Sequence, residues 1–396
     1  MKKTLLAAAV AALAVSSVAS AATIYDKDGT AVDVYGRVQA VYYSQDSGNN
    51  AQSAANDGNL NASSRLGFDF RSTLTDWATA VAKVEWQNAD DDANNDFNSR
   101  YVWVGVDFGE FGLVKAGKFE EAIKYVVETT DIFDDFGCMA QLGNDDRRDG
   151  MLGYYVSVQN FDFNATFGTP KDGQQVDGAF LGETHTGSTT GNAVGEEKVD
   201  IQYAWSMSFG YTTPEILFGP MSFRAGFGGA EMQPRDNGEG SHYDYYAKNV
   251  YDDYSNWALS ATWGTLDEGL YLSASYNERD FNFINPTDLV TGFTVDGYKI
   301  RGLEGVAAWT FANGVSVRGG IEWMNIESDG GADVEVDAVT APLYVLYQVN
   351  PNFRVWAEGR VNIDTHDGKN YSFRSVTHRT YNAMDNVFSV GARYTF

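Results

Sequence analysis

The sequence predicts an all-β fold, a sixteen-stranded antiparallel β-barrel that crosses a membrane with its apolar side chains facing lipid. Three observations support this prediction. Alternating apolar and polar residues dominate the 396-residue chain, and its connecting segments alternate between short and long. After the first residues, no apolar run approaches the roughly 18–20 residues of a membrane-spanning helix. Tyr, Phe and Trp form 14% of the chain, which excludes full disorder, and the single cysteine, Cys138, excludes an internal disulfide.

Residues 1–21 have the features of a removable export leader. A short positive start is followed by an apolar stretch from Leu5 to Val15, and Ala19-Ser20-Ala21 fits the small-x-small rule for cleavage. We therefore expect residues 1–21 to be a signal peptide and residues 22–396 to form one barrel domain. Loss of the leader's two lysines takes the formal net charge from −26 to −28. Because so acidic a chain repels phosphate, nucleic acid is not an expected partner.

Period-2 alternation is clearest between Asp200 and Phe209. Apolar residues share one face there (Ile201, Tyr203, Trp205, Met207 and Phe209), and polar or small residues share the other. Segments of this kind recur sixteen times, near residues 32–43, 63–72, 78–88, 99–108, 112–118, 149–158, 161–168, 199–212, 220–230, 256–264, 269–279, 299–311, 315–325, 338–349, 353–363 and 386–396.

The connectors between these segments are sorted by length. Short ones, such as Gly109-Glu110-Phe111 and Asn350-Pro351-Asn352, carry the residues that tight turns favour. Long polar ones alternate with them, at residues 44–62, 89–98, 119–148, 169–198, 231–255, 280–298, 326–337 and 364–385. Short turns at one end and long loops at the other are typical of outer-membrane barrels, whereas a water-soluble sandwich has no reason to sort its loops.

The apolar face of each segment is expected to point outward. Sixteen strands enclose a cylinder too wide for side chains to fill, so its interior should be wet. Ten residues rising ~3.3 Å each, at a tilt of ~40°, cover ~25 Å, the height of the lipid-facing band. Trp356 has the inward phase. Seven other tryptophans fall on the expected lipid face, as in an aromatic girdle: Trp86, Trp103, Trp205, Trp257, Trp263, Trp309 and Trp323.

The order and spacing of several segments resemble the general trimeric porins of Gram-negative bacteria. Residues 32–38 and 64–68 resemble that family's first two strands, residues 100–112 its fourth strand, turn and fifth strand, and residues 386–396, which end in Phe396, its last strand. The resemblance implies a multi-pass barrel of the outer membrane that forms a homotrimer and contacts lipid and lipopolysaccharide. It also implies a water-filled channel for passive diffusion of small hydrophilic solutes and ions.

In this family the third long loop folds back into the barrel and narrows it. Here that loop is residues 119–148, and residues 130–137 resemble the family's constriction segment. Asp131 and Asp135 stand at the places of its two inward carboxylates. Asp134-Asp135 replaces the usual Pro-Glu pair, and Cys138 replaces the usual second glycine. The resemblance thus implies that Asp131, Asp134 and Asp135 are the acidic residues of a pore constriction.

The facing wall of such pores carries a basic cluster. Arg37, Arg65 and Arg100 match its strand positions, and each has the inward phase in its own segment. Arg147 or Arg148 would complete the cluster, and we favour Arg148. Carboxylates on the loop and guanidinium groups on the wall would set a transverse field across the throat.

The charge of the whole chain predicts a preference for cations, supported by acidic loops such as Asp90-Asp91-Asp92. At ~0.15 M salt the Debye length is ~8 Å, so distant loop charges count less than charges in the throat. Four arginines facing two or three aspartates would give the throat a positive charge, which would act against the cation preference set by the acidic loops.

Other functions are weighed against this one. A substrate-selective sugar or nutrient channel would need an inward aromatic track, for which Trp356 and Tyr271 offer little. A plugged structural barrel or adhesin would have the same fold and would conduct nothing. An enzyme is disfavoured, because all four histidines fall in expected loops outside any metal-ligand motif and no nucleophile elbow is present. No metal or cofactor is expected.

Overall fold

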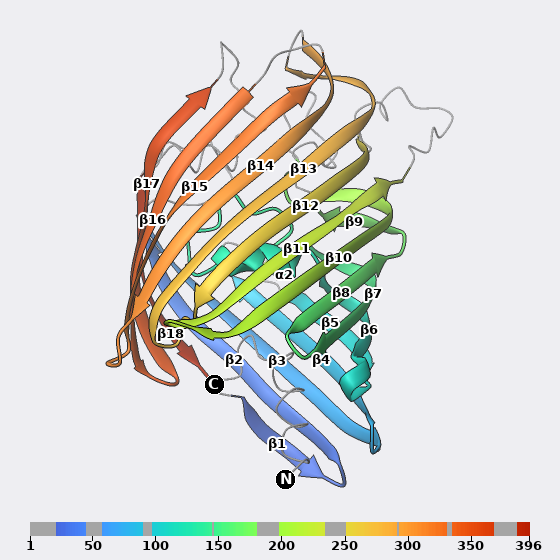
Figure 1. Ribbon diagram of the computed structural model, residues 1–396, viewed down its shortest axis with the longest axis vertical. Helices are drawn as coiled ribbons and strands as arrows, with labels where there is room; N and C mark the ends of the chain where they lie inside the picture. Colours follow the sequence, from blue (N-terminus) through green and yellow to red (C-terminus); the bar gives the residue numbers. More distant parts are fainter. Residues whose placement is uncertain are drawn as a thin grey trace.

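The computed structural model describes residues 21–44, 58–89, 97–144, 146–179, 198–233, 251–290, 293–330, 335–367 and 386–396. Within these residues, sixteen antiparallel strands close into a barrel, as the sequence predicts (Figure 1). No helix in these ranges is long and apolar enough to cross a membrane. The barrel strands are β2 (Thr30–Tyr43), β3 (Asn59–Thr75), β4 (Ala78–Ala89), β5 (Asn98–Asp107), β6 (Leu113–Glu120), β7 (Arg147–Val158), β8 (Phe161–Gly168), β10 (Lys198–Ile216), β11 (Gly219–Met232), β12 (Tyr251–Gly264), β13 (Gly269–Val290), β14 (Phe293–Thr310), β15 (Val315–Asp329), β16 (Glu335–Asn350), β17 (Phe353–Asp367) and β18 (Val387–Thr395).

The barrel closes at β2, where two strands share one edge. β18 pairs with β2 from Arg37 to Tyr43, and β1 (Ala22–Lys27) pairs with it from Thr30 to Val34. Where the two strands meet, the N–H of Gly36 donates to the carbonyl of Phe396 at 2.8 Å, and the N–H of Phe396 donates back at 3.0 Å. β1 and the C-terminal residue Phe396 both lie at the end of the barrel that carries the short turns (Figure 1).

Among the described residues, two strands were not predicted from the alternation. One is β1. The other is β9 (Lys171–Gln175), which follows β8 after a break at Thr169-Pro170 and pairs with the outer part of β10. Each is too short to show a period-2 pattern.

Several strands continue beyond their predicted ends. The alternation predicts that one segment stops at residue 279 and the next begins at residue 299, but β13 and β14 remain paired further out. Their outer faces become charged there: Lys299 lies 3.3 Å from Asp280, and Arg301 lies 3.3 Å from Glu278. The hydrophobic alternation ends where these strands leave the lipid-facing band. The backbone hydrogen bonds between the two strands continue beyond that point. Together β10–β17 form a tall wall, and the shorter strands β5–β8 continue the barrel beside β10 (Figure 1).

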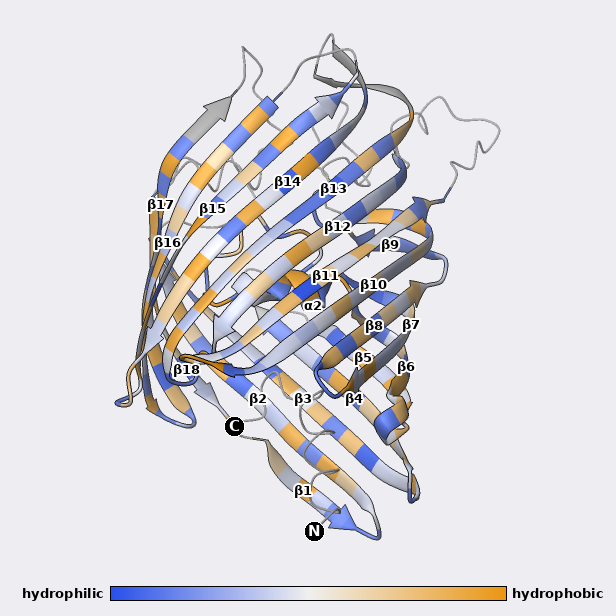
Figure 2. Cartoon of the chain, viewed as in Figure 1, coloured by the Kyte–Doolittle hydropathy of each residue, from blue (hydrophilic) through white to orange (hydrophobic). Residues whose placement is uncertain are grey.

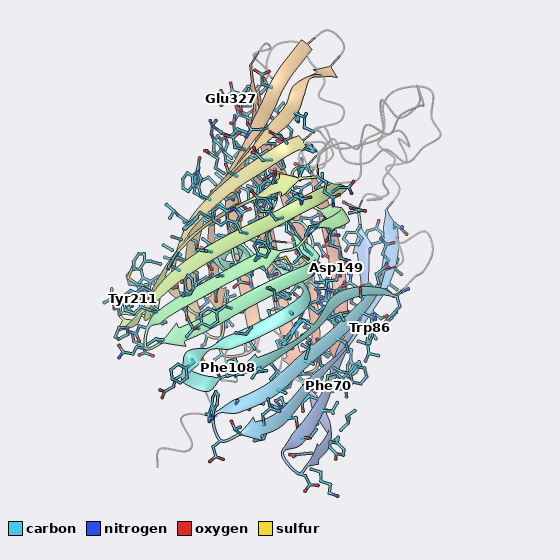
Figure 3. The ribbon with its side chains drawn as sticks, turned by 90° about the vertical axis from the view of Figure 1, so that its right-hand side faces the viewer. Phe70, Trp86, Phe108, Asp149, Tyr211 and Glu327 are labelled. Atoms are coloured by element: carbon cyan, nitrogen blue, oxygen red, sulfur yellow. The ribbon has the colours of Figure 1, made fainter. Side chains whose placement is uncertain are left out.

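The outer face of the barrel is apolar, as expected. Hydrophobic and hydrophilic residues alternate along its strands (Figure 2), and Phe70, Trp86 and Tyr211 project outward (Figure 3). Phe209 and Trp309 are 47% and 48% exposed on this face, while the residues next to them along each strand are buried or half-buried.

Two side chains predicted to face lipid lie inside the barrel. In β10, Gln202 is an extra residue between two paired positions, so Ile201 turns inward and is buried. In β5, Arg100 is the extra residue, so Trp103 turns inward, 5.0 Å from the Lys115 ammonium. A β-bulge reverses the phase of the residues beyond it, which a strict period of two misses. The other tryptophans of the expected girdle alternate with buried or half-buried inner-face residues.

Candidate functional site

A loop lies inside the barrel, as the resemblance implies. This segment, the inner loop (residues 121–144), follows β6 and carries the one-turn helix α2 (Lys124–Val127) and the 3₁₀ turn η2 (Glu128–Thr130). Its apolar side packs on the tall wall, where Val126 and Val127 are fully buried beside Ala258. A Cβ atom at Gly226 would lie 2.9 Å from Val126, so the wall admits the helix because it is lined there by small residues.

The first turn of the inner loop finds hydrogen-bond partners on β8 and β10. The backbone N–H of Ala122 donates to Thr166 Oγ1 at 3.1 Å, and that of Ile123 donates to Ser206 Oγ at 2.8 Å. These are backbone donors that the start of a helix leaves without a partner of its own. The inner face of β8 and β10 is therefore polar where the loop needs acceptors.

Three glutamates of the tall wall hold the rest of the inner loop by its backbone. Glu358 on β17 accepts the N–H groups of residues 134–137, at 2.5–3.2 Å. Glu322 on β15 accepts the N–H of Cys138 at 2.6 Å, and Glu304 on β14 accepts that of Ala140 at 3.0 Å. Charge-assisted hydrogen bonds of this kind are about twice as strong as neutral ones.

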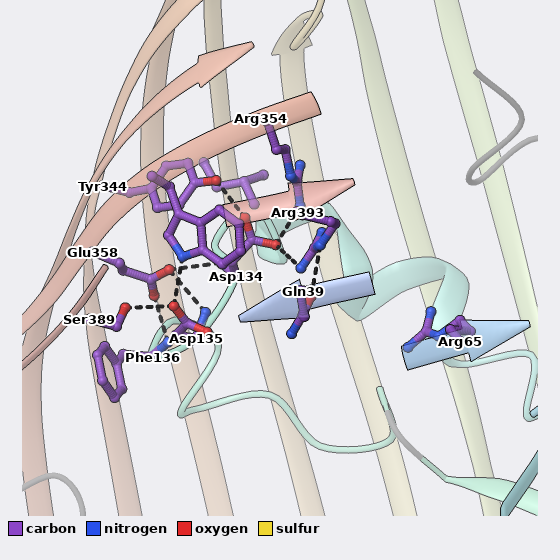
Figure 4. A network of polar contacts seen from close by, with 12 residues as sticks. Gln39, Arg65, Asp134, Asp135, Phe136, Tyr344, Arg354, Glu358, Ser389 and Arg393 are labelled. Carbon is purple, nitrogen blue, oxygen red and sulfur yellow. Dashed lines mark hydrogen bonds and ion pairs between the residues drawn. The ribbon is translucent and has the colours of Figure 1, made fainter. Parts of the chain in front are cut away.

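Asp134 and Asp135 also bind the wall (Figure 4). Asp134 accepts from Tyr344 at 2.5 Å and forms ion pairs with Arg354 at 2.6 Å and Arg393 at 2.9 Å.

The Asp135 carboxylate accepts hydrogen bonds from Tyr43, Trp356 and Ser389, at 3.0, 2.8 and 2.5 Å. Burial raises the pKa of Asp135, although the three donors lower it. Asp134 and Asp135 of the expected acidic triad thus tie the tip of the loop to β2 and β16–β18.

Asp131 is the member of the triad that is exposed. Asn144 Nδ2 donates to its carboxylate at 2.9 Å, and Cys138 Sγ donates at 3.2 Å. Cys138 stands where the resemblance expects glycine, and its φ of 72° is in the left-handed region that favours glycine. Burial raises the pKa of the Cys138 thiol well above its usual value, so the thiol stays protonated as a donor to Asp131.

Arg37, Arg65 and Arg100 lie together on the opposite wall. Arg37 and Arg65 are cross-strand partners on β2 and β3. Arg65 and Arg100 share one carboxylate, that of Glu85, at 3.5 and 2.9 Å. Their side chains are each 21% exposed although they point into the barrel. Because one carboxylate serves two guanidinium groups, this wall keeps an excess of positive charge.

Arg148 does not join this wall, and Arg147 takes the place expected for it. Arg147 pairs with Glu120 at 3.0 Å, and its side chain is 15% exposed. The Arg148 side chain is 2% exposed and pairs with Glu121 at 3.1 Å and Asp146 at 3.5 Å. The expectation for Arg148 was wrong because both arginines lie inside the barrel but turn to different partners. Arg147 turns toward Glu120 and Tyr101, whereas Arg148 lies under the root of the inner loop and donates to Tyr254 at 2.6 Å.

Sequence reasoning missed the wall residues that hold the loop. Glu304, Glu322 and Glu358 each occupy the inward phase of a predicted segment, and Arg354 and Arg393 are cross-strand partners on β17 and β18. Inward carboxylates on neighbouring strands would have been a usable signal. The contact of a given loop residue with a given glutamate has no counterpart in the sequence, because 164 to 224 positions separate them.

Comparison with known proteins agrees with this architecture. Residues 7–396 match the family model described as Gram-negative porin. The chain is 24% identical to outer membrane porin N of Escherichia coli K12 over 416 residues that cover both proteins completely. It matches the OmpF structure of Salmonella typhi, determined with daunomycin, with a TM-score of 0.66 at 18% identity, covering 95% of this chain and all of the other.

A trimer form of OmpT from Vibrio cholerae matches with a TM-score of 0.62 at 18% identity, covering 93% of this chain and all of that one. These structures show the fold, and the family model shows the kind of protein. The chain therefore belongs to the Gram-negative porins, which are channels of the outer membrane and not enzymes.

Proposed function

We propose that this porin is a general diffusion channel for small hydrophilic solutes and ions. The observation that carries the proposal is the partial exposure of charged side chains that face the inside of the barrel. Arg65, Arg100 and Arg354 are each 21–23% exposed although their strands direct them inward. Water therefore reaches the inner face beside the inner loop, as a hydrated pore requires.

The constriction in this proposal lies between the inner loop and the arginine wall. Asp131 is its exposed carboxylate, while Asp134 and Asp135 hold the loop in place. Arg37, Arg65, Arg100 and Arg147 are its basic side. Polar solutes orient their dipoles in the field between the two sides, and apolar solutes have to displace ordered water.

Single-channel recording of the purified protein in planar bilayers tests the proposal. We expect discrete conductance steps. Asp131→Asn should lower cation permeability relative to anions without changing the stability of the barrel, whereas Asp135→Asn should disturb the loop. Liposome swelling with sugars of graded size should show a simple size dependence. A silent barrel would refute the channel, and saturation by one sugar would indicate a selective one.

The proposed preference for cations comes from charge outside the throat. Glu85, Glu120 and Asp134 are each shared by two cationic groups, so the described throat carries no excess of negative charge. The excess lies in the rest of the chain, because the whole chain with its leader has a net charge of −26. The acidic run at residues 90–92 lies outside the described residues. Reversal potentials in a KCl gradient measure the sign, and an anion preference would refute it.

A selective sugar channel receives no support from the two aromatic residues considered for it. Trp356 is 3% exposed and donates to Asp135, and the Tyr271 hydroxyl donates to the Thr129 carbonyl at 2.6 Å. Both rings are therefore committed to holding the inner loop and present no face on which a sugar could stack.

A homotrimer in contact with lipid and lipopolysaccharide completes the proposal. The OmpT structure matched by this chain was determined in a trimer form. We propose the same assembly here, and cross-linking in intact membranes tests it. Residues 1–21 are proposed to be the signal peptide. All but Ala21 lie outside the described residues, and N-terminal sequencing of the exported protein tests that assignment.

A further inference from the structure

The tall wall is not wet along its whole inner face. At the outer ends of β10–β16 the inward side chains are apolar and buried, among them Ile201, Tyr254, Phe281 and Ile300. Within the described part of the chain, two segments cover them. One is the part of the inner loop that contains Met139 and Leu142. The other is the shelf, residues 171–179, which follows β8 and includes β9. Val176 and Ala179 of the shelf are fully buried in this core.

Buried charges fasten the shelf to the inner loop. The Asp177 carboxylate accepts the N–H of Gly143 at 2.9 Å, and the N–H of Asp177 donates to Asp146 at 2.7 Å. Arg279 on β13 pairs with Asp146 at 2.9 Å and donates to the carbonyl of Asp177 at 2.8 Å. Burial alone would raise the pKa of Asp146, but Arg279 and Arg148 outweigh it and lower that pKa.

The shelf also fits the wall in one position. Tyr298 donates to the Gly178 carbonyl at 2.6 Å. Gly178 has a φ of 84°, and a Cβ atom there would lie 2.6 Å from the end of the Ile300 side chain. This backbone is therefore seated against β14 at a point where only glycine fits without movement.

We infer that the shelf is a second, outer constriction of the pore. It fills the outer part of the lumen along the tall wall, so solutes entering from outside must pass along the opposite half, beside the strands that carry the arginine wall. Solutes are then selected by cross-section before they reach Asp131. The inference rests on the proposed open channel and adds a barrier that the inner loop alone does not provide.

Access of polymers from each side of the membrane tests this inference. Channels are inserted into planar bilayers in one orientation, and polyethylene glycols of graded size are added to one side at a time while single-channel conductance is recorded. For the parent protein we expect exclusion to begin at a smaller polymer on the outer side than on the inner side. In Asp177→Ala the outer limit should move to larger polymers and the conductance should rise, with the inner limit unchanged.

Two further variants separate the shelf from general damage. Asp172→Ala removes an exposed carboxylate of the shelf that accepts a hydrogen bond from Gln233 at 2.8 Å, and this variant should behave as the parent. Tyr298→Phe removes the hydroxyl bonded to Gly178 and keeps the ring, so it should also move the outer limit to larger polymers. It keeps the inference testable if Asp177→Ala fails to fold.

The outcomes distinguish this inference from the proposed function. Conducting channels with the same limit on both sides, or with an outer limit that no shelf variant moves, would overturn the shelf and leave the diffusion channel standing. A parent protein that inserts and never conducts would overturn both.

Discussion

The carboxylate of Glu358 should decide whether the inner loop stays docked. Its two oxygens accept four consecutive backbone N–H groups: those of Asp134 and Asp135 at 2.8 and 2.9 Å on one oxygen, and those of Phe136 and Gly137 at 2.5 and 3.2 Å on the other. Glu358→Gln keeps one oxygen and turns an NH₂ group toward the donors that the other oxygen served. Two buried backbone donors then lose their acceptor.

The expected size of the effect follows from these contacts. Each unsatisfied buried N–H costs about 1–3 kcal/mol, so docking of the loop tip should weaken by about 2–6 kcal/mol. Since 1.4 kcal/mol is a factor of ten, the undocked fraction should rise roughly 30-fold to 20,000-fold. The bonds of Asp134 and Asp135 to the wall remain, so the barrel itself should stay folded.

Single-channel recordings would show this change as rapid flicker between conductance levels and as closure at lower voltage. Glu110→Gln is the matched control, because Glu110 is an exposed glutamate in a short turn outside the lumen. Flicker in the Glu358 variant alone would support the anchoring role. Traces of Glu358→Gln that match the parent in conductance, noise and closing voltage would refute the reasoning.

Three further predictions concern the loop, the arginines and the loop charges. Gly302→Ala would place a methyl group 1.8 Å from the Ala140 carbonyl oxygen, so conductance and unfolding temperature should change; Gly305→Ala, whose nearest neighbour is Ile321 at 3.9 Å, should leave both as they are. Arg148→Met removes one partner of a buried network and should destabilise the barrel by about 3–5 kcal/mol in thermal unfolding. Arg147→Gln should instead change ion selectivity with little loss of stability, and the opposite pattern would argue against our placement of the two side chains. Finally, cation preference should be stronger near 0.01 M salt, where the Debye length is about 30 Å, than near 1 M, where it is about 3 Å; a preference that is constant with salt would locate its source in the throat.

The strand phases were predicted well except at bulges. Alternation placed Arg37 and Arg65 inside the barrel because the side-chain period of a strand is two wherever its pairing is regular. It misplaced Ile201 and Trp103 because an inserted residue shifts the phase, and nothing in a single segment reveals that its partner lacks the matching residue.

The inner loop was located by resemblance, but its contacts were not predictable. Three carboxyl groups within five residues would ordinarily point to water, yet Asp134 and Asp135 contact Arg393 and Ser389, about 250 positions away in the chain. Which side chain of a loop faces the lumen depends on the wall opposite it, and the same is true of Arg147 and Arg148 at the loop's far end.

The sequence by itself determined the barrel, its sixteen crossings and, away from bulges, the side of each strand that meets lipid. These features depend on local periodicity and on turn chemistry, and both can be read from residues that are close together in the sequence. Only the tertiary structure decided which carboxylates hold the loop, which one stays exposed and where apolar residues fill the inside. Those outcomes depend on pairings across the closed barrel, because a buried donor or charge takes whichever partner the opposite wall presents.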